Sequence, residues 1–439
     1  MQNFRMRCFI TFPFSLLLIV HSIDAFGFIS NKKINCFSSL KCNHCKQRKN
    51  NNGYYHTRLE KQNGISSNSY LEMTQSSVTF VSPLLSDGYL PAVESYEKGE
   101  IKPILLYLPG FDGTLIAPFL QFPELGTIFD VHGMNVPMED RSTFEELRIK
   151  VIQYILEITS DPEIKKSINM KGKKKIYIMG ESFGGILASS VALTIQEEYS
   201  KSVDLFGLIL INPATSYPRS NLSKLGPPVS QLPLFFYPFG IISKLVPLFM
   251  DQYQLPQLLL ILSSKALPSV IDTPAREAYM GRVALSLSQR VQFMPQETLK
   301  WRLEQWLTKG CQTLGKKCEN LTLLSKDLRT LIVVGEDDQT LPSVDESVRL
   351  TNTIPNSSVF VVKGAGHAST CGSRVDLAAL LRERFEELQD GSSRTEMKEI
   401  AKERDDLYFG MEPRYDGNTN IGMLPTRYWD KDVYKKMEV

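Results

Sequence analysis

The sequence has few histidines and cysteines and almost no net charge. Its 439 residues hold 50 Lys and Arg against 48 Asp and Glu, a formal net charge of +2, and no long basic tract lies in the middle of the chain. Because nucleic acids are bound through clustered positive charge, we expect no nucleic-acid partner. The apolar and charged fractions, 42% and 22%, are those of a globular protein.

The seven cysteines are too scattered for a disulfide framework. Cys42 and Cys45 have the spacing of a metal-binding pair, but no second pair of ligands follows them, so we expect neither a metal nor a cofactor. Cys311 and Cys318 are close enough in the sequence to pair. Free thiols in a reducing compartment are the preferred interpretation.

The first 65 residues have the composition of a targeting sequence. Residues 8–20 form an apolar run that is too short to span a bilayer comfortably, and Ala25 offers a cleavage site, so residues 1–25 resemble a signal peptide. Residues 26–65 resemble a transit peptide, because residues 26–59 contain no Asp or Glu and are rich in Lys, Arg, Ser and Asn. Together they resemble the two-part leader of algae with secondary plastids and predict a plastid location. A secretory signal followed by a basic linker is the alternative.

Between residue 66 and residue 390, short apolar runs alternate with helical patterns. The expected strands are residues 101–108, 126–131, 174–179, 205–211, 328–334 and 358–363, and the expected helices include 143–159, 344–353 and 375–388. This alternation predicts an α/β fold with a doubly wound, mostly parallel sheet. Ligands bind such sheets at the carboxyl ends of the strands, so we expect the site in the loops after Leu108, Met179, Val334 and Lys363.

The alternation stops in residues 217–310, where proline becomes frequent. Residues 232–262 carry only Lys244 and Asp251 as charges, but four prolines within these 31 residues argue against one membrane-spanning helix. Short kinked helices in a cap or lid insertion fit better. The apolar residues would line an acyl-chain tunnel, contact a lipid surface or pack only the cap's own core. A charged tail, residues 391–439, follows the domain.

The most informative motif is Gly180-Glu181-Ser182-Phe183-Gly184-Gly185. It lies between an expected strand and an expected helix, and this context resembles the nucleophile elbow of α/β-hydrolases. Glycine is needed on both sides of the serine because the turn is too tight for a Cβ. We predict that Ser182 is a nucleophile whose hydroxyl is exposed at the carboxyl edge of the sheet. A chance serine in an ordinary strand-to-helix turn is the alternative.

The scarcity of histidine narrows the choice of catalytic base. A serine hydroxyl needs a base within hydrogen-bond reach and a carboxylate that orients the base. Of the five histidines, only His132 and His367 lie outside the leader. The order in α/β-hydrolases is nucleophile, acid, histidine, so His367 is the predicted base. A structural role for this lone histidine is the alternative.

The acid and the oxyanion hole are predicted from the same strand order. Three acidic residues, Glu336, Asp337 and Asp338, follow the strand before His367. Asp338 is the preferred acid because of its spacing from Pro342, and Asp337 is the runner-up. The oxyanion hole needs two backbone donors, and the N–H groups of Phe111 and Phe183 are predicted to supply them.

Several segments together resemble the plastid phytyl ester synthase family. These are Leu108–Thr114, Asp140–Ser142, Gly180–Gly185, Asn212–Ser216 and Pro295–Cys311. The resemblance covers roughly residues 100–390, and Asn212–Ser216 is its most specific piece. Plant members continue into an acyltransferase-like domain with a His-x4-Asp pair. No histidine here has an aspartate five residues on, so we expect that domain to be missing.

The resemblance implies a serine acyltransferase or esterase of plastoglobules or thylakoid surfaces. Ser182 would take a fatty acyl group from an acyl lipid or acyl thioester and pass it to a hydrophobic alcohol, phytol or diacylglycerol. Peripheral contact with a membrane or lipid-droplet surface is implied as well. A lipase or thioesterase that releases fatty acid is the alternative, and a non-catalytic lipid-binding protein of this fold is disfavoured by the intact Ser, Asp and His.

Overall fold

The computed structural model describes residues 77–160, 174–250, 274–290, 292–370 and 375–388. The predicted leader and the predicted tail therefore lie outside the described residues, as does the part of the apolar insertion from residue 251 to residue 273. The domain boundaries expected from the sequence stay a prediction.

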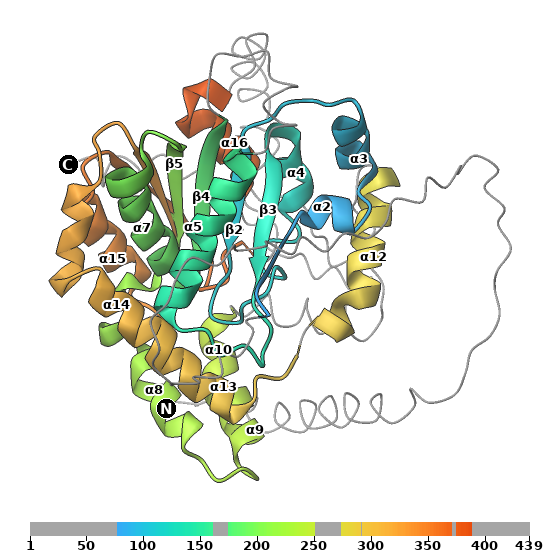
Figure 1. The fold of residues 1–439 in the computed structure, drawn as a ribbon. Helices are drawn as coiled ribbons and strands as arrows, with labels where there is room; N and C mark the ends of the chain where they lie inside the picture. Colours follow the sequence, from blue (N-terminus) through green and yellow to red (C-terminus); the bar gives the residue numbers. More distant parts are fainter. Residues whose placement is uncertain (1–76, 161–173, 251–273, 291, 371–374, 389–439) are drawn as a thin grey trace, which may run out of the picture. The chain divides into compact units, whose positions relative to one another are not determined.

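A seven-stranded sheet forms the centre of the fold, with strand order β1-β3-β2-β4-β5-β6-β7 (Figure 1). The strands are β1 (Thr79–Val81), β2 (Ile104–Leu108), β3 (Asp130–Asn135), β4 (Lys175–Glu181), β5 (Asp204–Ile211), β6 (Arg329–Gly335) and β7 (Ser357–Val362). β1 pairs antiparallel with β3, and the other neighbouring pairs of this described sheet are parallel. The predicted mostly parallel α/β sheet is confirmed.

Helices cover both faces of the sheet. The described α-helices, including those of the insertion, are α2 (Pro83–Ser86), α3 (Leu90–Glu97), α4 (Phe122–Ile128), α5 (Phe144–Ser160), α7 (Phe183–Thr194), α8 (Asn221–Ser230), α9 (Tyr237–Gly240), α10 (Val246–Phe249), α12 (Pro274–Arg290), α13 (Gln296–Trp301), α14 (Lys309–Thr313), α15 (Ser343–Thr351) and α16 (Leu377–Arg384). π-helical turns occupy η1 (Ile195–Tyr199), η3 (Ile241–Leu245) and η4 (Arg302–Thr308). 3₁₀ turns occupy η2 (Ala214–Arg219), η5 (Lys316–Leu323) and η6 (Glu386–Leu388).

Alternate residues of the strands belong to two separate hydrophobic clusters, one on each face of the sheet. On one face, Leu106 of β2 and Ile178 of β4 pack in a cluster with α5 and α7 residues. On the other face, Leu105 and Tyr177 pack in a cluster with α4 and α16 residues. All five residues of β2 are buried, as expected for a parallel strand covered on both sides. This arrangement makes the sheet doubly wound.

One expected strand was placed wrongly. Residues 126–131 were expected to form a strand, but α4 runs to Ile128 and β3 begins only at Asp130. Periodicity alone does not separate a short apolar run in a buried helix from one in a strand. Here Phe122, Leu125 and Ile128 recur at helical spacing and are buried against the sheet.

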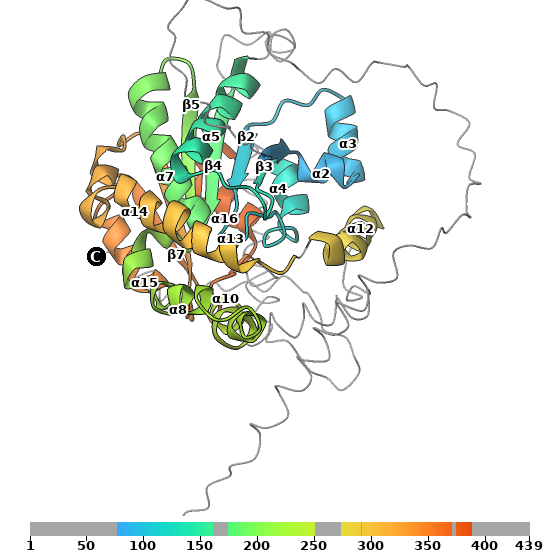
Figure 2. The ribbon, with the colours of Figure 1, turned by 60° about the horizontal axis from the view of Figure 1, so that its bottom comes forward.

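The described part of the proline-rich insertion consists of short helices. Pro238 and Pro247 stand in the first turns of α9 and α10, where proline is tolerated because the first N–H groups of a helix have no helical partner. Figure 1 and Figure 2 both show α8, α10 and α13 close together. None of the helices in the described ranges has the length and apolar character needed to cross a bilayer.

Candidate active site

Ser182 occupies a sharp corner between β4 and α7. Its backbone has φ 54° and ψ −114°, a left-handed conformation that is unusual for a residue with a side chain. The corner is anchored on both sides, because the N–H of Ser182 donates to the carbonyl of Ile211 at 2.8 Å. The carbonyl of Ser182 accepts from the N–H of Gly185 at 3.0 Å and from that of Ala214 at 2.9 Å. The strained geometry is therefore held by β5 and by the turn that follows it.

The glycines around Ser182 allow a very close backbone approach. A Cβ on Gly180 would lie 2.1 Å from the carbonyl oxygen of Gly184, and a Cβ on Gly184 would lie 2.0 Å from that of Leu108. No side chain fits at such distances. The structure thus confirms the tight turn that the sequence motif predicts.

The structure brings Ser182, His367 and Asp338 into one hydrogen-bonded chain. His367 Nε2 lies 2.9 Å from Ser182 Oγ, and His367 Nδ1 lies 2.8 Å from Asp338 Oδ2. The three residues come from the loops after β4, β7 and β6, as expected for the carboxyl edge of a parallel sheet. Asp337 is exposed instead, and its backbone N–H donates to the carbonyl of Ala365 at 2.9 Å. The catalytic role of the three residues stays a prediction at this point.

Asp338 is tightly held. Its Oδ1 accepts from the backbone N–H groups of Thr340 at 2.8 Å and Leu341 at 3.1 Å. Its Oδ2, the oxygen that faces His367, also accepts from the hydroxyl of Ser343. These donors fix the carboxylate in an orientation that favours a proton on Nδ1 of His367 and leaves Nε2 as the acceptor.

The expected exposure of the Ser182 hydroxyl is wrong. Ser182 is only 5% exposed and His367 only 4%. The end of α10 lies over the histidine: the ring centroids of Phe249 and His367 are 5.7 Å apart, and the N–H of Ala368 donates to the carbonyl of Phe249 at 3.0 Å. An insertion that begins far from His367 in the sequence closes this side of the site.

A second buried carboxyl group, on Glu181, lies close to the histidine. Burial lowers the pKa of His367, but the charges of Asp338 and Glu181 outweigh it, so the pKa is raised. Burial raises the pKa of Glu181 itself. Its carboxylate accepts from the hydroxyls of Tyr107 at 2.6 Å and Thr370 at 2.9 Å. No role for Glu181 was predicted from the sequence.

One predicted oxyanion donor, Phe183, follows Ser182 in the chain, and the loop of the other, Phe111, lies near Ser182 in space. Phe183 follows Ser182 directly, and Gly110, the neighbour of Phe111, lies so near that its Cβ would be 3.6 Å from Cβ of Ser182. Among the residues that the structure describes, the backbone N–H groups of Phe111 and Phe183 donate to no protein acceptor. Two free N–H groups beside a serine hydroxyl are suited to bind a developing negative charge.

Asn212 is a site residue whose role was not predicted from the sequence. It is completely buried and has φ 40°, another left-handed backbone. Its amide donates to the carbonyl of His367 and to Ser369 Oγ at 3.0 Å, and its Oδ1 accepts from the N–H of Gly335 at 2.7 Å. The signal in the sequence was the Asn-Pro pair that ends β5, at the same sheet edge as the elbow.

His132 is not part of this site. Its Nδ1 lies 2.6 Å from the hydroxyl of Tyr154, between β3 and α5. In the described ranges, no group of three or more His, Cys, Asp or Glu side chains is arranged to hold a metal ion. Cys311 and Cys318 are free thiols, as predicted, and burial raises the pKa of both.

Comparison with known proteins adds evidence on fold and family. The family model described as alpha/beta hydrolase fold matches residues 103–370. Phytyl ester synthase 1, chloroplastic, of Arabidopsis thaliana is 30% identical over 284 residues, 64% of this chain and 37% of that protein. Phytyl ester synthase 2, chloroplastic, of the same plant is 29% identical over 295 residues, with the same coverage of 64% and 37%.

The chain thus spans little more than a third of the length of these curated relatives. Over that part, the predicted resemblance to phytyl ester synthases is confirmed. A solved structure of MenH from S. aureus has a TM-score of 0.44 and 16% identity, covering 66% of this chain and 96% of that one.

Proposed function

Because this chain belongs to the alpha/beta hydrolase fold family, we propose that it is a serine-dependent acyltransferase or esterase that acts on fatty acyl lipids. One observation carries the proposal: the continuous hydrogen-bonded chain from Ser182 Oγ through His367 to Asp338, with distances of 2.9 and 2.8 Å. The similarity to proteins named phytyl ester synthases supports an acyl ester as the substrate class.

The proposed reaction starts with attack by Ser182 Oγ on the carbonyl carbon of an ester or thioester. His367 Nε2 accepts the hydroxyl proton, and the N–H groups of Phe111 and Phe183 bind the oxyanion. His367 then gives the proton to the departing alcohol or thiol, which leaves an acyl group on Ser182. Asp338 keeps the Nδ1 proton in place and stabilises the imidazolium.

The second half of the reaction transfers the acyl group to an acceptor. His367 takes the proton of an acceptor alcohol, whose oxygen attacks the acyl carbonyl, and the proton returns to Ser182 Oγ as the new ester leaves. Water in place of the alcohol would give a free fatty acid. The burial of Ser182 and the cover of Phe249 over His367 support an alcohol, because a closed site disfavours attack by bulk water. Phytol and diacylglycerol are the proposed acceptors.

Replacement of the nucleophile tests the chemistry. Ser182→Ala should abolish both labelling by a fluorophosphonate probe and all acyl transfer. The control is Ser189→Ala, which should keep both, because Ser189 is a buried serine whose hydroxyl donates to the carbonyl of Gly185 at 2.8 Å. Undiminished turnover in Ser182→Ala would disprove the mechanism. Failure of the wild-type protein to react with the probe would instead favour a non-catalytic lipid-binding protein.

The acceptor is tested by product analysis. Purified protein is given a fatty acyl thioester or an acyl galactolipid, with phytol, with diacylglycerol or with neither. We expect new ester to form at the expense of free fatty acid when an alcohol is present. Release of fatty acid at the same rate under all three conditions would identify a lipase or thioesterase.

We also propose that the protein contacts a lipid surface through an apolar tip, defined as Leu234, Phe235, Phe236 and Phe239. These side chains are between 55% and 89% exposed, although Tyr237 in the same segment is buried. Residues 220–250 contain two lysines and no acidic residue. Exposed aromatic groups in a segment with two lysines and no acidic residue favour an anionic lipid interface over a neutral one.

Flotation with vesicles tests the apolar tip without any need for turnover. We expect binding to vesicles of phosphatidylcholine with phosphatidylglycerol, and its loss when Phe235, Phe236 and Phe239 are all changed to Gln. The control changes Tyr96 and Leu323 to Gln, since these side chains are 73% and 72% exposed elsewhere on the molecule. Flotation of the triple variant at the wild-type level would refute the contact.

A plastid location is proposed from the leader and from the chloroplastic names of the relatives. A fluorescent protein that carries residues 1–65 should enter plastids when expressed in an alga with secondary plastids. Secretion of that fusion would support the secretory alternative. Plastoglobules or thylakoid surfaces are the proposed place of action inside the plastid.

A further inference from the structure

A single π-helical turn contacts both predicted oxyanion residues. Residues 296–313 form one helix, in which α13 and α14 are joined by the π-helical turn η4. π-helical turns inside α-helices are uncommon, and many of those that occur lie at functional sites. Arg302 and Trp306, both in η4, are completely buried.

Arg302 holds the loop of Phe111. Its Nη1 donates to the carbonyl of Phe111 at 2.9 Å, and its Nη2 donates to the carbonyls of Val136 at 3.2 Å and Pro137 at 2.9 Å. The same loop is paired with Val136, whose N–H donates to the carbonyl of Gly113 at 2.8 Å. The guanidinium thus joins the end of β3 to the loop that carries the first donor.

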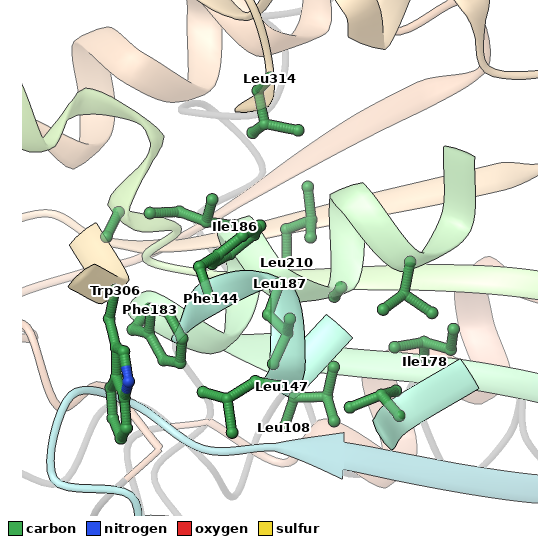
Figure 3. Close-up of a cluster of buried hydrophobic side chains, with 14 of the residues drawn as sticks. Leu108, Phe144, Leu147, Ile178, Phe183, Ile186, Leu187, Leu210, Trp306 and Leu314 are labelled. Atoms are coloured by element: carbon green, nitrogen blue, oxygen red, sulfur yellow. The ribbon is translucent and has the colours of Figure 1, made fainter. Parts of the chain in front are cut away.

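Trp306 supports the second donor. Figure 3 shows its indole beside the ring of Phe183. The two rings are stacked, with centroids 4.7 Å apart and planes 20° from parallel. The guanidinium carbon of Arg302 lies 4.2 Å from the Trp306 ring centroid. A continuous path of contacts therefore runs from Phe111 through Arg302 and Trp306 to Phe183.

Burial of a guanidinium group carries a desolvation penalty. Burial lowers the pKa of Arg302 to about 10, and its Nε has no hydrogen-bond partner among the described residues. Its three hydrogen bonds go to carbonyl oxygens, so they orient backbone, while the nearby carboxyl of Asp112 offsets only part of the effect of burial on the pKa. An apolar side chain of similar size would pack here at a lower electrostatic cost.

We propose that Arg302 and Trp306 are positioning residues that fix the backbone N–H groups of Phe111 and Phe183 relative to one another. The inference rests on the proposed function for its catalytic consequence, but the restraint on the loop is a property of the fold. Neither side chain touches the reacting atoms. Each sets the direction of a peptide N–H, and the oxyanion is stabilised only when both N–H groups point to the same place.

Two variants test the restraint. Arg302→Lys keeps the charge but loses the planar fork that reaches several carbonyls at once, and Trp306→Phe shortens the stacked surface with little risk to folding. Each has a matched control. Arg141→Lys alters an arginine that donates to the carbonyl of Met138 at 2.7 Å and to Thr298 Oγ1 at 3.0 Å on α13. Trp301→Phe removes an indole that, like Trp306, donates to the carbonyl of Ser142 but is not the one stacked on Phe183.

The first readout is amide hydrogen exchange by mass spectrometry. We expect exchange in the peptide that covers Gly110–Thr114 to rise about tenfold in Arg302→Lys and to stay at the wild-type level in Arg141→Lys. This measurement does not depend on turnover. Unchanged exchange in Arg302→Lys would overturn the inference whatever the activity of the protein.

The second readout is kinetic. In Arg302→Lys, kcat should fall about 10- to 100-fold with KM nearly constant, and the affinity for an alkyl trifluoromethyl ketone, which forms a tetrahedral adduct on the serine, should fall by the same factor. In Trp306→Phe, kcat and the affinity for the ketone should also fall with KM nearly constant, but by a smaller factor. Equal losses in the control variants, or a loss confined to KM, would overturn the inference. Absence of any Ser182-dependent turnover in the wild type would refute the proposed function, and the exchange result alone would then decide the restraint.

Discussion

Asn212 donates a hydrogen bond to the backbone carbonyl of His367. Through its Oδ1, the same side chain accepts from the N–H of Gly335, at the end of the strand that leads to Asp338. One buried amide therefore joins the loop of the predicted base to the strand of the predicted acid. The backbone of Asn212 is fixed in turn, since its N–H donates to the carbonyl of Val333 at 2.8 Å.

Loss of this amide should misplace His367. Asn212→Gly tolerates φ 40° but removes the side chain, and we expect a fall in kcat of about 10- to 100-fold with little change in KM. The buried N–H of Gly335 loses its acceptor, so the free energy of unfolding should fall by about 1–3 kcal/mol. Steady-state kinetics and denaturant titration measure both effects. Asn221→Ala is the control, because Asn221 is exposed and donates at 2.8 Å to the carbonyl of Gln339 in the acid loop.

Substitution of Asp337 and of Asp338 by Asn tests which of the two is the catalytic acid. Asp338→Asn should lower kcat by about 10³- to 10⁴-fold, because an amide that donates toward Nδ1 selects the wrong tautomer of His367. Asp337→Asn should change kcat by less than about threefold, since this side chain is exposed at the surface. Comparable losses in the two variants would mean that the acid has been assigned incorrectly.

The acid limb of the pH–rate profile should reflect the ionisation of His367. The imidazole accepts a proton only when neutral, and its pKa is raised, so activity should fall on acidification at a higher pH than for a free histidine. Glu181→Gln removes a negative charge that favours the imidazolium. The pKa of His367 should then fall, and the acid limb of kcat/KM should move to lower pH. An unmoved limb would show that Glu181 carries a proton in the active protein and exerts no charge on the histidine.

Replacement by alanine should lower the free energy of unfolding at Gly184 and raise it at Gly281. Gly184→Ala places a Cβ 2.0 Å from the carbonyl oxygen of Leu108, so the elbow must move. We expect a loss of about 3 kcal/mol or more in the free energy of unfolding. Gly281→Ala in α12 meets nothing within 4 Å, and alanine is the better helix former, so a gain of about 0.5–1 kcal/mol is expected there. Thermal and denaturant unfolding measure both, and similar changes in the two variants would contradict the packing argument.

The meeting of Ser182, Asp338 and His367 was predictable because it depends on strand order alone. In a parallel sheet the loops after successive strands share one edge, so residues after β4, β6 and β7 come together without knowledge of packing. The cover over the site was not predictable in the same way. Phe249 reaches His367 only through the path of the inserted helices, and sequence periodicity does not encode that path.

The supporting residues escaped prediction for a related reason. Asn212 acts through bonds to backbone carbonyls and N–H groups, which leave no mark on the partner's residue type. The helix α4 was missed because its buried apolar residues form a run that also suits a strand. Both errors arise where tertiary contact, and not local pattern, decides the structure.

The bond between Arg302 and Phe111 has a consequence for the timing of maturation. The two residues are 191 positions apart, and Ser182 lies between them in the chain. Synthesis from the N-terminus therefore produces the serine and both peptide N–H groups well before the arginine that restrains the first of them. A nascent or truncated chain that ends before residue 302 would carry the nucleophile without this restraint, and also without the predicted acid Asp338 and base His367. Reactivity should therefore arrive late, once the far end of the domain has been made.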